Sequence, residues 1–256
     1  MSNKTARLVE VFSAIQGEGQ NVGTRQIFIR FGNCDLRCDY CDSAHTWVAP
    51  LEYRVEANPG LRDFETHSNP VELDTLLNFV ERQNVPGLHD SISLTGGEPL
   101  LHAPFLAAFL PKVRSLTNLP IYLETGGHRP EQLLTILPYL NSVGMDLKLP
   151  SVSGESRWQE HAKFLQYCYD SSVEVFVKII ISSQTDVLEL ERAANLVAAV
   201  NPEILVYLQP VTPLEVDKES IFAPSPEQVL SWQALMKKFL KQVRVVPQTH
   251  KMLHQL

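Results

Sequence analysis

Three of the chain's four cysteines fall within eight residues, as Cys34, Cys38 and Cys41, while Cys168 stands alone. Three thiolates on one loop can bind three irons of a four-iron cluster and leave the fourth iron open to an exogenous ligand, because soft thiolates favour iron–sulfur clusters or zinc over hard cations. Zinc would need a fourth ligand, and His45 is close enough in sequence to offer one. The spacing favours the cluster over zinc and leaves Cys168 as a small buried hydrophobe on a helix face.

The overall charge limits the classes of partner. The 256 residues carry a formal net charge of −7, from 22 basic and 29 acidic side chains. This balance, without a Lys/Arg-rich run, disfavours direct nucleic-acid binding and favours a small-molecule substrate. The chain has no run of about 18 apolar residues, so its sequence predicts no membrane span. The N-terminal MSNKTARLVEVFS lacks the apolar region of a signal peptide. We therefore expect no membrane contact and a cytoplasmic location, where disulfides are rare.

The elements that must position the cysteines alternate between strand and helix. Apolar runs rich in Val, Ile and Leu indicate a parallel sheet covered by helices, in about six β–α steps. Six units are too few for a complete eightfold barrel, so we expect an α/β fold of partial (β/α)6-type barrel form with parallel strands. The predicted strands are 26–31, 91–95, 120–124, 142–149, 173–181, 203–210 and 243–250, and the predicted helices are 73–80, 105–113, 130–140, 156–168, 186–200 and 226–239.

The chain is expected to form one domain, residues 1–256. Residues 48–70 contain Pro50, Pro59, Gly60 and Pro70 and predict an irregular insertion inside that domain. The helix that starts at Pro226 has Ser225 as its predicted N-cap and Gln228 at its third position, which is a capping-box pattern. In barrels of this kind the chemistry lies at the carboxyl ends of the strands, and the cysteine loop follows the strand 26–31 directly.

The cysteine spacing after the first predicted strand, together with LTGGEPLL (94–101) after the second, resembles the radical S-adenosylmethionine superfamily. Alone, Gly96–Gly97 would be read as a tight turn. The resemblance implies a radical SAM core in which the open iron of a 4Fe-4S cluster binds the amino and carboxylate groups of S-adenosylmethionine. Glycines at 96 and 97 would let the backbone approach the methionyl part closely.

Further segments resemble one family in that superfamily, the 7-carboxy-7-deazaguanine synthases. They are FSAIQGEG (12–19), GTRQIFIRFGNCDLRCDYCDSAHTW (23–47), YLETGG (122–127), DLKLPS (146–151), YLQPVTP (207–213) and RVVPQTHKML (244–253). The resemblance implies a carbon–nitrogen lyase of queuosine and deazapurine biosynthesis, a tRNA modification pathway. It would convert 6-carboxy-5,6,7,8-tetrahydropterin to 7-carboxy-7-deazaguanine and ammonia by a radical ring contraction, with S-adenosylmethionine regenerated in each cycle.

The same resemblance implies a role for each matching residue. Cys34, Cys38 and Cys41 would hold the cluster. The residues implied to contact S-adenosylmethionine are Tyr40, Cys41, Asp42, Gly97, Asp146, Leu147 and Lys148, and those implied to contact the pterin are Ile15, Gln16, Gly17, Arg30 and Thr95.

Arg30 is a charge inside a buried-looking strand. It is either a bidentate clamp on the substrate carboxylate, for which a guanidinium is suited, or the partner of a neighbouring acid. Glu124 is likewise either a polar contact to S-adenosylmethionine or a buried acid paired with a lysine or arginine. Gln248 and His250 would lie near the pterin edge, or are ordinary polar turn residues.

Two departures from the family pattern concern Ser43 and residues 146–148. The family binds Mg²⁺ through a hydroxyl two residues past the third cysteine, commonly a threonine, and this chain has Ser43 there. Ser43 is therefore expected to ligate Mg²⁺, or alternatively to cap a helix after the cysteine loop. Many members read Ser-Pro-Lys where this chain has Asp146, Leu147 and Lys148, and Lys148 is equally well read as a structural ion-pair partner.

The resemblance also implies an electron donor such as flavodoxin or ferredoxin, and a homodimer. Two other functions fit the cysteines. One is a radical SAM activase acting on a partner protein, which gives no reason for the QGEG motif, Arg30 or the QTHK motif. The other is a non-enzymatic zinc-loop interaction module, in which the cysteines would bind one zinc ion.

Overall fold

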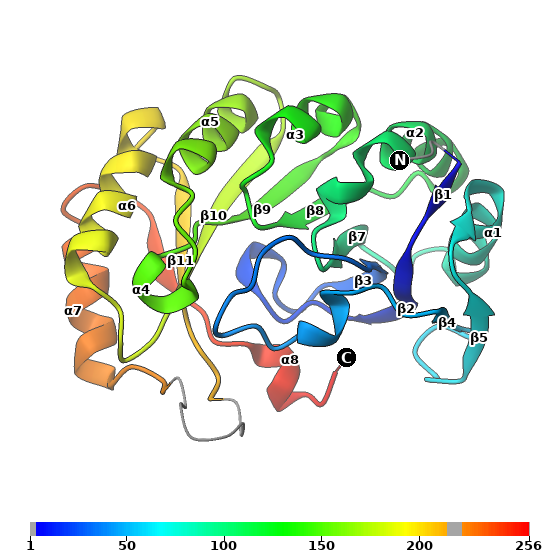
Figure 1. Cartoon of the computed structure of the whole chain (residues 1–256), viewed down its shortest axis with the longest axis horizontal. Coiled ribbons are helices and arrows are strands. Elements are labelled where there is room, and N and C mark those ends of the chain that lie inside the picture. Colours follow the sequence, from blue (N-terminus) through cyan, green and yellow to red (C-terminus); the bar gives the residue numbers. More distant parts are fainter. Residues whose placement is uncertain (1–3, 214–221, 256) are drawn as a thin grey trace.

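The computed structural model describes residues 4–213 and 222–255. Its main sheet has ten strands in the order β12-β11-β10-β9-β8-β7-β3-β2-β4-β5. Seven neighbouring strands are parallel, and Figure 1 shows them curving into an open barrel. The first and last of these seven strands do not pair with each other. The parallel strands are β3 (Arg25–Phe31), β7 (Ser91–Gly96), β8 (Ile121–Thr125), β9 (Ser142–Asp146), β10 (Glu174–Ile181), β11 (Leu205–Pro210) and β12 (Val243–Val245).

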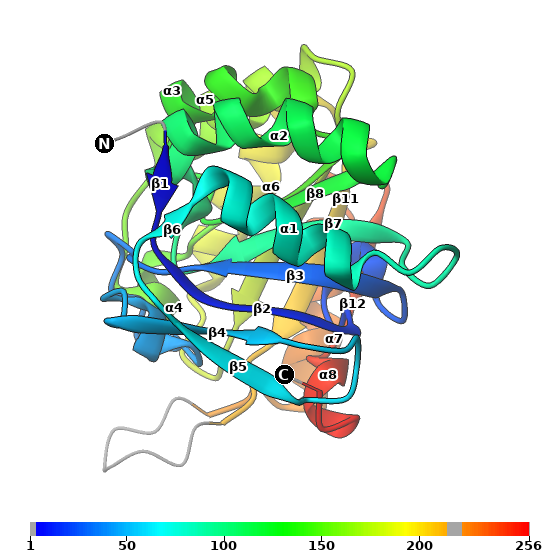
Figure 2. The same cartoon turned by 90° about the vertical axis from the view of Figure 1, so that its right-hand side faces the viewer.

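A helix connects each parallel strand to the next, and these helices cover the outer face of the sheet (Figures 1 and 2). The arrangement confirms the predicted partial (β/α)6-type barrel. Within the described residues, no helix combines the length and apolar character needed to cross a membrane. The connecting helices are α1 (Leu73–Gln83), α2 (Ala103–Thr117), α3 (Pro130–Ile136), α5 (Trp158–Tyr169), α6 (Val187–Val200) and α7 (Pro226–Met236), with short helices α4 (Pro150–Ser153) and α8 (Thr249–Met252).

Local sequence accounts for several of these elements. The run EVFVKIII forms β10, which lies between two parallel neighbours and is buried over most of its length, as its β-branched composition predicts. The capping box predicted for α7 is present, because the Ser225 side chain accepts a hydrogen bond from Gln228 N and the Gln228 side chain accepts one from Ser225 N. Cys168 is fully buried on α5, which confirms its prediction as a small core residue.

One of the two strands next to β3 in the sheet was not predicted from the sequence. Residues Leu8–Ile15 form β2, which pairs antiparallel with β3 in the middle of the sheet. Its Val11 side chain packs in the core, while Phe12 lies on the opposite face and stacks on Phe28 at 5.0 Å. The QGEG motif directly follows β2, whose last residue, Ile15, is paired with Arg25 at the start of β3, so the motif begins at the end of β3 opposite the cysteine loop.

The prediction that residues 48–70 are irregular is wrong for two segments. Glu52–Glu56 form β4 and Phe64–Ser68 form β5, an antiparallel pair joined to the sheet beside β2. The prolines and Gly60 lie outside both strands, so they flank the strands and do not interrupt the strand pairing. A second, two-stranded sheet pairs β1 (Thr5–Ala6) with β6 (Val71–Glu72). Figure 2 shows β4 and β5 next to β2, along the edge of the sheet.

Candidate active site

The cysteine loop and the carboxyl ends of the parallel strands line one cavity of about 440 Å³. This volume is in the range of sites that hold small molecules and cofactors. The structure brings nearly all the predicted site residues to its wall, and Glu124, Gln248 and His250 join them there. The predicted residues in the wall are Ile15, Gln16, Gly17, Arg30, Cys34, Cys38, Tyr40, Cys41, Asp42, Ser43, Thr95, Gly97, Asp146 and Lys148.

Leu147 is the one predicted site residue whose side chain lies elsewhere. It is buried in the hydrophobic core and is absent from the cavity wall. Only its backbone is polar, and Leu147 N donates a hydrogen bond to Lys178 O at 2.9 Å. Because side chains alternate along an extended segment, Asp146 and Lys148 face the cavity and Leu147 faces away.

The three clustered cysteines face the cavity as free thiols. Burial raises the pKa of Cys34 to about 11 and also raises the pKa of Cys38, so metal binding must release protons from them. Among the described residues, the sulfur atoms of the three cysteines do not all lie within 4.8 Å of one another, and the ring nitrogens of His45 do not complete such a group with them.

Glycines at the end of β7 allow the cysteine loop to pack against that strand. A side chain on Gly97 would overlap the backbone carbonyl of Asn33, and one on Gly96 would overlap the backbone of Phe31. Gly96 also has φ = +124°, which favours glycine. Glu98 N then donates to Asn33 O at 2.9 Å. The two glycines therefore fix the loop that carries Cys34 beside the end of β7.

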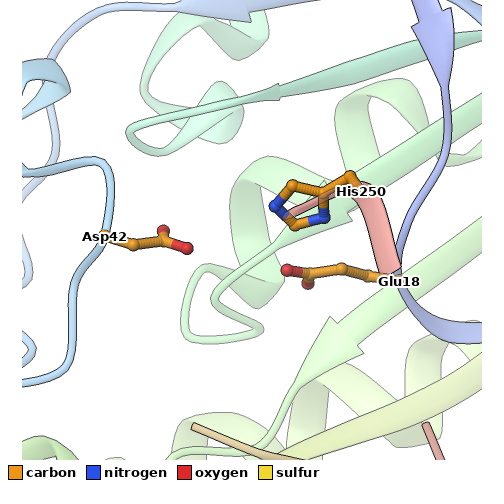
Figure 3. A group of neighbouring side chains, drawn as sticks. All are labelled: Glu18, Asp42 and His250. Carbon is orange, nitrogen blue, oxygen red and sulfur yellow. The ribbon is translucent and has the colours of Figure 1, made fainter. Parts of the chain in front are cut away.

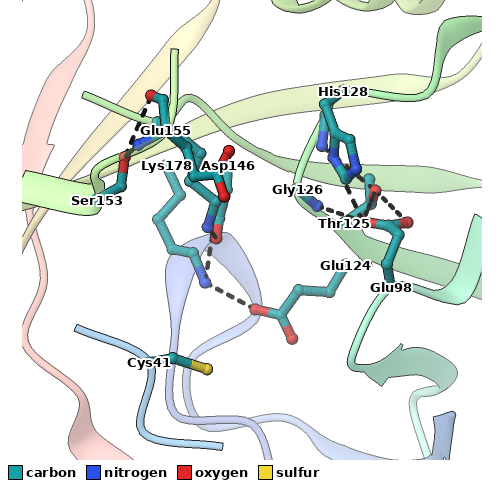
Figure 4. A network of polar contacts seen from close by, with 12 residues as sticks. Cys41, Glu98, Glu124, Thr125, Gly126, His128, Asp146, Ser153, Glu155 and Lys178 are labelled. Atoms are coloured by element: carbon teal, nitrogen blue, oxygen red, sulfur yellow. Dashed lines mark hydrogen bonds and ion pairs between the residues drawn. The ribbon is translucent and has the colours of Figure 1, made fainter. Parts of the chain in front are cut away.

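Glu98, to which the sequence analysis gave no role, ties two strand ends together. Its buried carboxylate accepts hydrogen bonds from Thr125 Oγ1 at 2.8 Å and from Gly126 N at 2.9 Å. It also accepts one from Leu100 N, which starts the turn after β7. Figure 4 shows these contacts converging on Glu98. Glu98 thus holds the turn after β7 against the end of β8.

Lys178 on β10 is the centre of a buried charge cluster. Its ammonium contacts Glu18, Glu124 at 2.8 Å and Asp146 at 3.3 Å. Figure 4 shows Lys178 between Glu124 and Asp146. Burial alone would lower the pKa of Lys178, but the three carboxylates raise it well above its ordinary value. Glu124 is therefore a buried acid paired with a lysine, as one of its two sequence interpretations held, and it also accepts a hydrogen bond from Thr95 at 3.1 Å.

Asp146 also pairs with Lys148, at 2.7 Å, and Lys148 lies over the Tyr40 ring at 5.2 Å. Lys148 therefore has the ion pair that one interpretation of the sequence predicted. Within the described residues, the buried Gln209 Oε1 accepts no hydrogen bond, and the buried Asp146 Oδ1 has only the ion pair with Lys178 at 3.3 Å. Both residues line the cavity, so these acceptors fit a ligand that brings hydroxyl or amino donors, such as S-adenosylmethionine.

The QGEG turn meets the C-terminal segment across the cavity. Thr249 N donates to Gly17 O at 2.9 Å, and the Gln248 amide donates to both Glu18 and Asp42 at 2.8 Å. Figure 3 shows His250 and Glu18 on one side and Asp42 facing them. Ligand atoms of Glu18, Asp42 and His250 lie within 4.8 Å of one another, but Lys178 and Lys251 already pair with the two acids.

Glu18 is a partly buried, paired acid, with its side chain 14% exposed. Burial by itself would raise the pKa of its carboxyl, but the charge of Lys178 outweighs that effect and holds the pKa below its ordinary value. The interpretation of QGEG as a turn with a solvated glutamate is therefore wrong. Sequence inspection missed Lys178 because it lies within the apolar run of β10.

Arg30 points to the cavity and also has an acidic partner. Its Nε donates to Glu10 Oε1 at 2.7 Å, so the ion pair expected by the alternative interpretation is present. Within the described residues, the two Nη nitrogens of Arg30 have no hydrogen-bond partner, which leaves the end of the guanidinium for a ligand. Glu10 and its second partner, Arg54, also line the cavity and were not predicted.

Ser43 lies between the cysteine loop and a short 3-10 helix, Ala44–Thr46. It occupies the N-cap position, but its side chain makes no capping hydrogen bond. Its hydroxyl lies 3.9 Å from Cys41 Sγ and faces the cavity. The hydroxyl is thus placed for a ligand and is not used by the helix.

Comparisons with known proteins agree with this geometry. The model of the Radical SAM superfamily matches residues 28–203. The chain is 42% identical to a 7-carboxy-7-deazaguanine synthase of Geobacter sulfurreducens over the full length of both, and 30% identical to one of Thermococcus kodakarensis over 84% of this chain and 87% of that one.

Solved structures show the same fold at low sequence identity. QueE from Escherichia coli is similar with a TM-score of 0.57 and 19% identity, covering 96% of this chain and 95% of that one. A radical SAM methyltransferase from Sphaerobacter thermophilus has a TM-score of 0.63 and 12% identity, covering 93% and 77%. With a full-length relative at 42% identity and a family model over most of the chain, the protein belongs to the radical SAM superfamily and, within it, to the 7-carboxy-7-deazaguanine synthase family.

Proposed function

We propose that this chain converts 6-carboxy-5,6,7,8-tetrahydropterin to 7-carboxy-7-deazaguanine and ammonia, as a radical SAM carbon–nitrogen lyase. One observation carries the proposal: three free cysteines, the Gly96–Gly97 turn and Arg30 face a single cavity of small-molecule size. Family membership implies a 4Fe-4S cluster and S-adenosylmethionine as cofactors. When bound, they supply the one-electron chemistry that removes a hydrogen atom from the substrate and later returns it.

The chain's own residues bind and orient the reactants. Cys34, Cys38 and Cys41 hold the cluster as thiolates. The turn at Gly97 leaves room for the methionyl part of S-adenosylmethionine, and the acceptors on Asp146 and Gln209 bind its donors. Tyr40 and Asp42 border the same ligand from the cysteine loop.

The pterin lies on the other side of the cavity in this proposal. The free end of the Arg30 guanidinium binds its carboxylate, because two parallel N–H donors match two carboxylate oxygens. Ile15, Gln16, Gly17 and Thr95 line the space beside it. Glu18, held by Lys178 and Gln248, offers a fixed acceptor to the N–H groups of the ring.

Ser43 is proposed as the protein ligand of a Mg²⁺ ion that is otherwise bound by substrate oxygens. Its hydroxyl faces the cavity and makes no capping bond, which supports this role over that of a helix cap. Magnesium commonly keeps few protein ligands. The carboxylates of Glu18 and Asp42 are less suited, because Lys178 and Lys251 already neutralise them.

The remaining parts of the proposal concern the setting of the enzyme. We propose that one domain spans residues 1–256, with 48–70 as an insertion, and that the chain acts as a homodimer reduced by a donor such as flavodoxin or ferredoxin. The ends of that range, residues 1–3 and 256, and residues 214–221 lie outside the described structure. Three thiolates of a cluster favour a reducing compartment, which supports a cytoplasmic location.

Reconstitution tests the proposed function. Protein purified without oxygen, reconstituted with iron and sulfide and then reduced, is incubated with the carboxy-tetrahydropterin, S-adenosylmethionine and Mg²⁺. We expect about four irons per chain and formation of 7-carboxy-7-deazaguanine with one ammonia per product. A colourless protein with one zinc per chain would favour the zinc-loop module, and an iron-loaded protein that leaves the pterin unchanged would contradict the proposed substrate.

A further inference from the structure

Three charged side chains form a row across three neighbouring strands at the edge of the cavity. Glu10 on β2 is the register partner of Arg30 on β3 and of Arg54 on β4. Register partners on adjacent strands place their side chains on the same face of the sheet. The row therefore follows from strand pairing, and its third member comes from the β4–β5 hairpin.

The carboxylate of Glu10 is shared between the two arginines. Arg30 Nε donates to Oε1 at 2.7 Å, while Arg54 Nε donates to Oε2 at 2.8 Å. The Glu10 side chain is only 5% exposed, whereas that of Arg54 is 48% exposed. Each guanidinium also lies over an aromatic ring, Arg30 over Phe12 at 5.5 Å and Arg54 over Phe64 at 4.6 Å. These contacts fix the direction of both arginines.

The row has one positive charge in excess. Two guanidiniums contribute two positive charges, Glu10 contributes one negative charge, and all three residues line the cavity. An excess cation beside a cavity attracts an anion of matching charge. Without Arg54, the Arg30–Glu10 pair would be neutral overall and would attract a carboxylate much less.

We propose that Arg54 is a specificity-determining residue that makes the cavity selective for a pterin with a carboxylate. This inference rests on the proposed function. Arg54 neutralises Glu10, so that Arg30 can bind the substrate carboxylate with its full charge. The β4–β5 hairpin thereby supplies part of the substrate site, which gives residues 48–70 a function in recognition.

The test compares two ligands on reconstituted enzyme loaded with S-adenosylmethionine. The ligands are 6-carboxy-5,6,7,8-tetrahydropterin and tetrahydropterin, which lacks the carboxylate. The variants are Arg54→Gln, the double variant Glu10→Gln/Arg54→Gln, and the control Arg82→Gln. Arg82 pairs with Glu65 of the same hairpin but lies outside the cavity wall. Iron content and S-adenosylmethionine affinity are measured for every variant.

We expect Arg54→Gln to weaken carboxypterin binding by about tenfold or more, since it removes a charge that balances a buried acid. Tetrahydropterin binding should stay unchanged. The double variant has Arg30 as its only charge in the row, so it should recover most of the lost affinity. In turnover, KM should rise in Arg54→Gln while kcat changes little, and Arg82→Gln should behave like the parent.

Three results would overturn the inference. One is unchanged carboxypterin affinity in Arg54→Gln, and another is an equal loss for both pterins, as a merely structural role would cause. The third is a double variant as weak as Arg54→Gln. If the parent protein itself binds neither pterin, the proposed function fails and this inference fails with it, whereas normal parent turnover with an unaffected Arg54→Gln overturns the inference alone.

Discussion

The charges in the cavity wall are held in sets, so each residue acts partly through its partners. Lys178 contacts three carboxylates, Glu10 contacts two arginines, and Lys148 contacts Asp146. Burying an unpaired charge costs about several kcal/mol, so each group depends on its partners to offset that cost. A single substitution in such a set therefore removes one contact and also leaves a buried charge behind.

The cysteines give the first prediction at this scale. Replacing Cys34, Cys38 or Cys41 by alanine should abolish turnover and lower the iron content, because each thiol supplies one iron ligand. Cys168→Ala should keep both, because Cys168 lies in the core and outside the cavity wall. Iron analysis and product formation measure the two effects. Full activity of Cys38→Ala would refute the assignment of these residues to a cluster.

Arg30→Lys gives the second prediction. Lysine offers one mobile point charge in place of two parallel donors, so the substrate carboxylate should be held less well. The loss of such a partly buried, charge-assisted contact costs about 2–5 kcal/mol, or roughly 30-fold or more in affinity. S-adenosylmethionine affinity should hardly change. Titration of both ligands checks this, and a parallel loss for both would identify Arg30 as a structural partner of Glu10.

The sequence could identify those site residues whose chemical type is informative by itself. Clustered thiols, paired glycines and an arginine in an apolar strand indicated residues that the structure brings together at one cavity. Lys178, Glu10 and Arg54 were missed because their significance comes from neighbours far away in the chain. Lys178 meets Glu18 across 160 positions, for example, and no local pattern marks such a contact.

At the scale of elements, the end of β7 and the start of the cysteine loop must approach each other closely. Gly97→Ala would place a methyl group against the Asn33 carbonyl, one residue before Cys34. Because the obstacle is a backbone atom, the cysteine loop must move. We therefore expect the iron content to fall to about half or less of the roughly four irons per chain expected for the parent protein. Gly87→Ala is the control for backbone strain alone, since its φ of +73° disfavours alanine while the position is exposed, meets open space and lies outside the cavity wall. Normal iron content in Gly97→Ala would contradict this packing role.

Apolar periodicity was sufficient to locate the parallel strands and their helices, since buried strands and amphipathic helices carry that signal in their own residues. It failed for β2, whose sequence has polar residues on both faces of the strand. Glu10 lines the cavity and pairs with Arg30, whereas Ser13 lies on the opposite face and contacts His89. Periodicity also failed for β4 and β5, which lie at the edge of the sheet and carry many polar side chains between prolines. β4 pairs with β2, and β5 pairs in turn with β4.

At the scale of the whole molecule, His161 couples stability to pH. It is fully buried on α5, where Nδ1 donates to Gly127 O at 3.0 Å and Nε2 accepts from Lys148 N at 3.1 Å. Burial lowers its pKa to about 4, against about 6.5 when unfolded. Between these pH values the unfolded chain binds more protons than the folded one. The contribution of His161 to the free energy of unfolding is therefore fully present above about pH 6.5 and falls as the pH drops towards 4.

His161→Gln should flatten this dependence. The lowering of the His161 pKa from 6.5 to about 4 corresponds to a change of about 3 kcal/mol in the free energy of unfolding, as an order of magnitude. Urea unfolding of cluster-free protein at several values between pH 4 and 7.5 measures it, with the exposed His254→Gln as the control. If the free energy of unfolding of His161→Gln falls with pH as steeply as that of the parent, other groups cause the pH dependence.

The most direct test of the whole account is the fate of deuterium at C6 of the pterin. The reduced, reconstituted enzyme is given 6-carboxy-tetrahydropterin deuterated at C6, and S-adenosylmethionine is recovered and analysed by mass spectrometry during turnover. The account predicts that deuterium enters S-adenosylmethionine while its total amount stays constant and 7-carboxy-7-deazaguanine accumulates. Product formed with unlabelled S-adenosylmethionine, or with stoichiometric accumulation of 5′-deoxyadenosine and methionine, would contradict it.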